Sequence, residues 1–99
     1  MNQMEVVLYV RKRSLRCRRA KGLLAHKGYY VKVIHTTNEE LGELLMPFGQ
    51  ELSHKKTVPY VFVDHRPVGG LSDIKSLERT GTLERLIRGA RYRHPRKVR

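Results

Sequence analysis

Thiols are almost absent from this sequence: among 99 residues, Cys17 is the single cysteine. One cysteine excludes an internal disulfide. No apolar run approaches the roughly 20 residues needed to span a bilayer, so we expect no membrane partner. The first residues also lack the charged, then apolar, then small-residue order of a secretory signal, which predicts a cytoplasmic protein. The length fits one compact domain, which we expect to be a monomer.

Acidic residues are also scarce, and the chain is strongly basic. Its 21 Lys and Arg residues against nine Asp and Glu residues give a formal net charge of +12. Seven basic residues and no acidic ones lie within residues 11–21, and six more basic residues lie within 88–99. Most acidic residues gather in 39–51 and 73–84. This uneven charge predicts a surface region that attracts anionic partners.

Short hydrophobic blocks predict four strands. Residues 4–10 and 58–63 are apolar and rich in β-branched residues, as in buried strands, and residues 30–35 alternate in the manner of a strand. A tight turn at 64–66 and a short edge strand at 67–68 complete a hairpin. The turn is too short for anything but an antiparallel pair.

Apolar residues at helical spacing predict three helices, one after each of the first, second and last strands. The first helix starts at a capping Ser14, carries Cys17, Ala20, Leu23 and Leu24, and stops at Gly28. The second starts at Thr37 or Asn38 and runs to Leu52, with Pro47 distorting its second half and an apolar stripe of Leu41, Leu44, Leu45 and Phe48. The third covers 71–78 and 82–88 and is interrupted near Gly81.

This order predicts a thioredoxin-like α/β fold with the succession β-α-β-α-β-β-α. A strand-helix-strand unit favours a right-handed parallel crossover, while the hairpin is antiparallel, so the four-stranded sheet must be mixed and flanked by helices on both faces. We assign residues 1–88 to this domain. Residues 89–99 form a basic C-terminal tail without apolar periodicity, which we expect to be flexible.

Several short motifs, in this order and at these intervals, resemble the glutaredoxin family over residues 5–88. They are Val7-Leu8-Tyr9, Ala20-Lys21 with Leu23-Leu24, Thr57-Val58-Pro59, and Gly69-Gly70-Leu71-Ser72-Asp73. The resemblance implies a thiol-disulfide oxidoreductase with glutathione as co-substrate and no metal. Its partners would be glutathione or a protein in a mixed disulfide.

The sequence departs from that family at the reaction loop. The family has Cys-x-x-Cys or Cys-x-x-Ser, and its first cysteine attacks, whereas this chain has Ser14-Leu15-Arg16-Cys17. By resemblance, Ser14 stands in the position of the missing nucleophile and Cys17 in that of the resolving cysteine. A serine hydroxyl without a base cannot replace a thiolate, so the enzyme would be weak or inactive if Ser14 is native.

The serine is either a natural loss of the thiol or an engineered change. The Pro-Tyr that the family often has between the cysteines is Leu15-Arg16 here. This second departure favours natural divergence.

Cys17 has two competing interpretations. Neighbouring arginines and the helix N-terminus would lower the pKa of its thiol and make it reactive. Its helical spacing with Ala20 and Leu24 instead predicts a thiol that points into the core, where burial makes it unreactive. We favour the buried thiol.

The resemblance also implies a glutathione groove. Arg11 falls where the family has a lysine that pairs with a glutathione carboxylate. Pro59 would be cis and face the thiol, and Val58 would offer an unpaired backbone N–H and C=O to an extended peptide.

The γ-glutamyl end would be held at the start of the last helix. Gly69-Gly70 allows close approach of the backbone, and Gly70, Leu71 and Ser72 would present N–H groups to a carboxylate. Asp73 would contact the ligand's amino group or only favour the start of the helix.

Two other functions compete with turnover. The chain could be a non-catalytic module that binds glutathione, a thiol peptide or a protein, or it could bind nucleic acid through residues 11–21 and the tail. The five histidines, His26, His35, His54, His65 and His94, have no cysteine or carboxylate at ligand spacing, so we expect no metal site.

Overall fold

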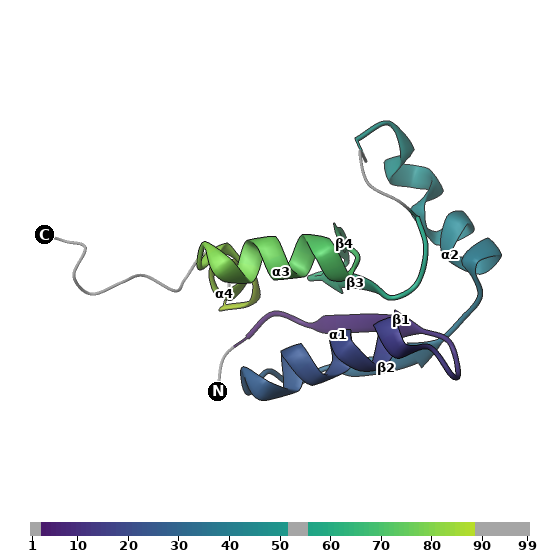
Figure 1. Cartoon of the computed structure of the whole chain (residues 1–99). Coiled ribbons are helices and arrows are strands. Elements are labelled where there is room, and N and C mark those ends of the chain that lie inside the picture. Colours follow the sequence, from purple (N-terminus) through teal and green to yellow (C-terminus); the bar gives the residue numbers. More distant parts are fainter. Residues whose placement is uncertain (1–2, 52–55, 89–99) are drawn as a thin grey trace, which may run out of the picture.

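The computed structural model describes residues 3–51 and 56–88 and follows the predicted order of elements (Figure 1). The predicted tail at 89–99, the predicted end of the second helix at Leu52, and His54 lie outside these residues. The elements are β1 (Val6–Val10), α1 (Leu15–His26), β2 (Lys32–His35), α2 (Asn38–Leu45), the 3₁₀ helix η1 (Met46–Glu51), β3 (Tyr60–Val63), β4 (Arg66–Gly69), α3 (Leu71–Arg79) and α4 (Thr82–Arg88).

The four strands form one mixed sheet in the order β2-β1-β3-β4. Strand β1 runs parallel to β2 and antiparallel to β3, and β3 pairs antiparallel with β4. Asp64 and His65, which connect β3 to β4, both have a positive φ, as two-residue hairpin turns require. The predicted thioredoxin-like fold is therefore confirmed.

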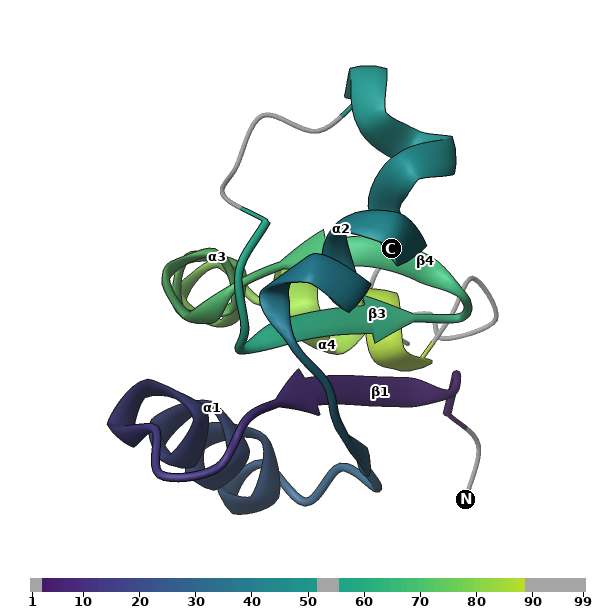
Figure 2. The same cartoon turned by 90° about the vertical axis from the view of Figure 1, so that its right-hand side faces the viewer.

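One face of the sheet is aliphatic and lies against α1 and α3. Val6 and Leu8 of β1 stand opposite Val63 and Val61 of β3, and all four are buried. The helices α1 and α3 contact each other and lie together in Figure 2. Their buried side chains that join this core are Cys17, Ala20, Leu24, Leu71 and Ile74.

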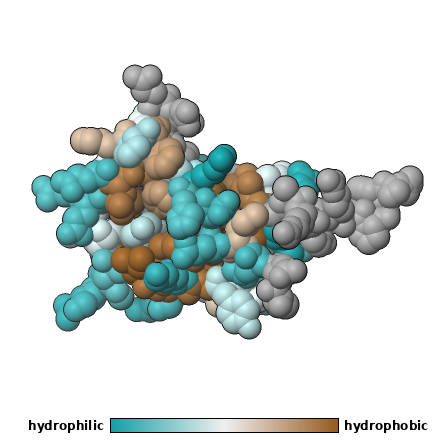
Figure 3. Space-filling model, turned by 180° about the vertical axis from the view of Figure 1, so that it is seen from behind, coloured by the Kyte–Doolittle hydropathy of each residue, from teal (hydrophilic) through white to brown (hydrophobic). Residues whose placement is uncertain are grey.

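The other face of the sheet is aromatic. Tyr9, Tyr60 and Phe62 share it, and the rings of Tyr9 and Phe62 meet edge to face with centroids 5.4 Å apart. Phe48 of η1 covers Phe62 at a centroid distance of 6.5 Å. The cover is incomplete, because Tyr9 and Phe48 are only partly buried, and hydrophobic atoms reach the surface on the side seen in Figure 3.

Tyr60, the first residue of β3, is fully buried on this second face. Burial raises the pKa of its hydroxyl to about 12, and the carboxylate of Asp73 adds to the shift. The phenol therefore remains neutral in the folded protein at any ordinary pH.

The second helix is distorted in its second half, as predicted. It is α-helical only to Leu45 and continues as the 3₁₀ helix η1, since Pro47 cannot donate an i→i−4 hydrogen bond. Thr37 is the cap, and its hydroxyl accepts from the N–H of Glu40 at 3.1 Å. The expectation that Leu44 joins the buried stripe is wrong: it is 42% exposed, whereas Leu41 and Leu45 are fully buried.

The third strand begins at Tyr60, so the prediction that it starts at Val58 is wrong by two residues. Pro59 has no N–H for a strand ladder, and its peptide bond to Val58 is cis. The predicted helix break at Gly81 is confirmed, since this glycine has φ +81 between α3 and α4. Within the described residues, no helix is long and apolar enough to cross a membrane.

The buried phenol predicts a loss of stability at alkaline pH. Unfolded tyrosine ionises near pH 10, whereas folded Tyr60 does so at about 12. Because its folded pKa is raised, its contribution is complete below pH 10 and is lost as the pH rises toward 12. We expect Tyr60→Phe to reduce the loss in unfolding free energy between pH 9 and 11.5 by about 1–2 kcal/mol.

Urea unfolding followed by circular dichroism at each pH measures this difference. Tyr30→Phe is the matched control, because Tyr30 is 74% exposed and its substitution should leave the pH dependence unchanged. Equal alkaline slopes for Tyr60→Phe and the parent chain would contradict the assignment.

Candidate functional site

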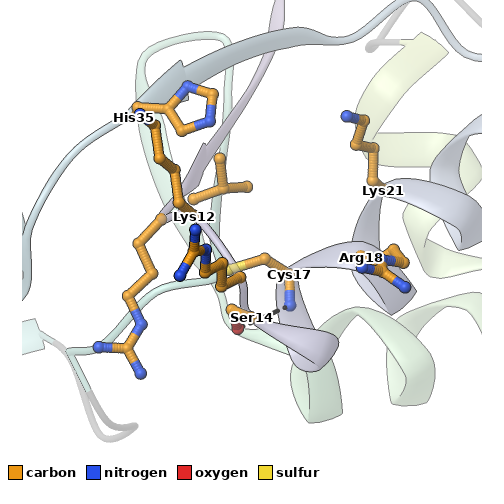
Figure 4. Close-up of a pocket in the computed structure, with 9 residues that line it drawn as sticks. Lys12, Ser14, Cys17, Arg18, Lys21 and His35 are labelled. Carbon is orange, nitrogen blue, oxygen red and sulfur yellow. Dashed lines mark hydrogen bonds between the residues drawn. The ribbon is translucent and has the colours of Figure 1, made fainter.

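The loop after β1 ends at a serine that starts α1. Ser14 is the N-cap, and its Oγ accepts a hydrogen bond from the N–H of Cys17 at 3.2 Å (Figure 4). This cap confirms the predicted start of the helix. The hydroxyl oxygen is thereby fixed at the positive end of α1.

Cys17 lies in the first turn of this helix and is 4% exposed. It belongs to the same core cluster as Ala20 and Leu24, as its helical spacing predicts. The expectation of a buried thiol is confirmed. The cysteine also forms part of the wall of a surface pocket.

That pocket is strongly basic. It encloses about 400 Å³ between the ends of β1 and β2 and the start of α1. Figure 4 shows Lys12 and His35 on one side of the hollow, Lys21 on the other, and Ser14 and Cys17 at its base. Its lining residues are Val10, Arg11, Lys12, Arg13, Ser14, Cys17, Arg18, Lys21 and His35.

None of the pocket's cations is in an ion pair with another residue of the described ranges 3–51 and 56–88. The ion pairs found there are Lys27–Glu78, His65–Glu5 and Arg88–Glu84. The pocket therefore concentrates uncompensated positive charge beside the N-terminus of α1. Arg11, which the resemblance assigns to a carboxylate, is one of these exposed cations.

A second group of predicted residues meets where β3 and α3 begin. A Cβ built on Gly70 would lie 3.2 Å from the carbonyl oxygen of Pro59, so the two segments approach closely. At Gly69, which has φ +142, a Cβ would come within 2.6 Å of the Asp73 side chain. Gly69 is therefore required by its positive φ and by this contact, whereas a side chain at Gly70 would need the Pro59 backbone to shift by a few tenths of an ångström.

Asp73 lies in the first turn of α3. Its Oδ2 accepts the N–H of Gly70 at 3.0 Å, so it favours the helix start in this structure. Gly70 thus does not present a free N–H, and that part of the expectation is wrong. The N–H groups of Leu71 and Ser72 form no hydrogen bond with any residue in the described part of the chain, as the first two residues of a helix commonly do not.

Val58 also differs from its prediction. Its N–H donates to Oδ1 of Asn38 at 3.1 Å, so the expectation of an unpaired N–H at this position is wrong. Asn38 is the first residue of α2, and the sequence suggested only a capping role for it. Nothing in the local pattern could reveal a bond that joins residues 20 positions apart.

The predicted site residues belong to two parts of the structure. Arg11, Ser14 and Cys17 line the basic pocket. Val58, Pro59, Gly70, Leu71 and Ser72 lie at the starts of β3 and α3. Among the residues that the structure describes, no cluster of three or more His, Cys, Asp or Glu side chains could hold a metal ion.

The chain was compared with known proteins. It matches no protein-family model. Glutaredoxin 1 of Rickettsia prowazekii is 32% identical over 85 residues, which cover 83% of this chain and 85% of the relative.

Solved structures of other glutaredoxins are also similar to this chain. The solution structure of glutaredoxin from Brucella melitensis has a TM-score of 0.66 and 32% identity, covering 85% of this chain and 88% of that one. The crystal structure of a buckwheat glutaredoxin-glutathione complex shares the fold, with a TM-score of 0.65, 23% identity, and coverage of 82% and 74%. Similarity of this extent, on the same strand order, shows that the chain belongs to the glutaredoxin family of thiol oxidoreductases.

Proposed function

We propose that this glutaredoxin binds glutathione, free or in a mixed disulfide, and that Ser14 occupies the position of the attacking cysteine. The observation that carries this proposal is the Ser14 cap: its Oγ lies at the N-terminus of α1, three residues before the chain's only thiol. A cysteine at this position would hold its sulfur at the positive end of the helix, beside basic side chains.

Ser14 lacks the chemistry to begin thiol-disulfide exchange. The reaction needs a thiolate, and a hydroxyl becomes a comparable nucleophile only when a base removes its proton. Within residues 3–51 and 56–88, the hydrogen bond of the Ser14 side chain is the one from Cys17 N–H, in which the hydroxyl oxygen accepts. That bond supports a structural cap and no proton transfer.

Cys17 is poorly placed to act as the substitute. Its thiol is 4% exposed, and an attacking sulfur must align with both sulfurs of the target disulfide. We assign it the role of a resolving cysteine without a partner in this chain. Binding without turnover is then the function of the unaltered protein.

The proposed groove uses groups that the fold leaves available. Leu71 and Ser72 direct two backbone N–H groups from the start of α3, and Ser72 is exposed. These donors suit a carboxylate, and the guanidinium of Arg11 suits a second one. The buckwheat protein of the same fold, which has been crystallised with glutathione, supports glutathione as the ligand.

Asn38 must give way if Val58 pairs with a bound peptide. The side-chain amide oxygen of Asn38 accepts the hydrogen bond from the Val58 N–H, which an extended ligand would otherwise receive. Binding through this N–H therefore replaces an existing hydrogen bond and gains little net energy. In the proposed groove, one backbone N–H that a ligand would use is thus already hydrogen-bonded within the protein.

The proposal predicts that Ser14→Cys introduces disulfide reductase activity. We expect the rate of glutathione-dependent reduction of a small mixed disulfide to rise about a hundredfold or more, because a thiolate replaces an unactivated hydroxyl. A coupled assay that follows NADPH consumption measures this rate.

Ser14→Ala is the control for the cap alone. It should remain inactive while destabilising the protein by about 1 kcal/mol, because the N–H of Cys17 loses its acceptor. If Ser14→Cys folds and gains no activity, Ser14 is not at the nucleophile position. Substantial turnover by the unaltered chain would equally refute binding without turnover.

The competing bond of Asn38 makes a separate prediction. Asn38→Ala frees the Val58 N–H, so glutathione should bind about two- to tenfold more tightly, as expected for one hydrogen bond. Isothermal titration calorimetry measures the affinity. Asn38→Asp, which keeps an acceptor at the same place, should show no such gain, and an equal or weaker affinity in Asn38→Ala would exclude pairing through this N–H.

A further inference from the structure

The basic pocket beside α1 holds more positive charge than the proposed function uses. A glutathione carboxylate would engage Arg11, which leaves Lys12, Arg13, Arg18 and Lys21 around the same hollow. Glutathione at neutral pH has two carboxylates and one ammonium, a net charge of about −1. Four cations of the pocket therefore remain without a counter-charge from either the ligand or the described protein residues.

The fold does not benefit from this arrangement. Like charges around one hollow repel each other, and the first turn of α1 contains no acidic residue, although its N-terminus favours negative charge. Arg16 lies in that first turn, which adds a further unfavourable cation. A bound anion would relieve both effects at once.

We propose that this pocket is a second ligand site, which binds an oligophosphate such as the phosphate chain of a nucleotide. A chain of two or three phosphates carries several negative charges within a few ångströms, which matches the four remaining Lys and Arg side chains around one hollow. Guanidinium groups bind phosphate in a bidentate manner and ammonium groups act as point charges. The volume, about 400 Å³, falls within the range of about 300–1,000 Å³ for small-molecule sites.

The residues that line the pocket also determine which part of a nucleotide it would recognise. It contains cations, Val10, Ser14, Cys17 and His35, but no Phe, Tyr or Trp ring on which a nucleobase could stack. Recognition therefore depends on the number of phosphates. Inorganic triphosphate and ATP should bind with similar affinity, and both should bind more tightly than orthophosphate.

This site lies beside the proposed glutathione groove and is separate from most of it. The pocket involves the end of β2, whereas the groove involves the starts of β3 and α3, and in the sheet β1 lies between β2 and β3. Arg18 and Lys21 line only the pocket. Their substitution tests the oligophosphate site without altering the residues assigned to glutathione.

The test compares two double variants that have the same net charge. Arg18→Gln with Lys21→Gln removes two charges from the pocket, while Lys75→Gln with Arg79→Gln removes two exposed charges from α3. Calorimetric titration of the full chain with inorganic triphosphate at low salt measures affinity. Amide NMR shifts locate the binding.

We expect the pocket variant to bind triphosphate about tenfold or more weakly and the control variant to bind it within about twofold of the parent. The shifted amides should belong to residues 10–21 and to His35. Lys12→Gln, in the exposed loop, provides a second pocket variant should the α1 variant fail to fold, and should weaken binding several-fold.

Three results would overturn the proposal. These are no binding of triphosphate below millimolar concentration, an equal loss in both double variants, and shifts spread over the whole surface. A single-stranded oligonucleotide that binds more tightly than triphosphate, equally in both variants, would assign the positive charge to a nucleic-acid surface instead.

Discussion

The hydrogen bond from Cys17 N–H to Ser14 Oγ sets the geometry of the end of the protein that contains the basic pocket. It fixes where α1 begins, and successive residues of a helix then turn by about 100°. With this start, Cys17, Ala20 and Leu24 face the aliphatic side of the sheet and are buried. Arg18 and Lys21 fall on the flank that borders the basic pocket. A helix that began one residue later would have no such cap, so a single hydroxyl couples the core to the charged surface.

Much of this arrangement could be predicted because it follows from local patterns. The apolar, β-branched block of β1, the helical spacing after Ser14 and the break at Gly81 each depend on neighbouring residues only, and each was correct. The predictions failed where a distant segment decides the outcome. Asn38 reaches Val58 across 20 residues, and Asp73 takes the N–H of Gly70 that a ligand was expected to use. Leu44 is exposed because it lies about 100° around α2 from Leu45, away from the face that buries Leu41 and Leu45.

The acidic residues are distributed unevenly among the helix N-termini. Two acidic residues occupy the first turn of α2 and Asp73 the first turn of α3, where the helix dipole favours them. Helix α1 has the opposite pattern, with no acidic residue in its first turn. Its start is stable because Ser14 satisfies one N–H and because Cys17, Ala20 and Leu24 are anchored in the core. Burial of these side chains outweighs a dipole term of about 0.3–1 kcal/mol per charge.

In the proposed function, the site keeps its binding groups and lacks its nucleophile, so that recognition of the ligand is separated from chemistry. The cis bond at Pro59 and the close contact of Gly70 with Pro59 shape the groove through the backbone, so their geometry does not depend on which side chain caps α1. Serine and cysteine differ by one atom, and serine is the better cap. The same position therefore balances helix stability against reactivity: the hydroxyl holds the start of α1 more firmly, and the sulfur alone would form a bond to a substrate.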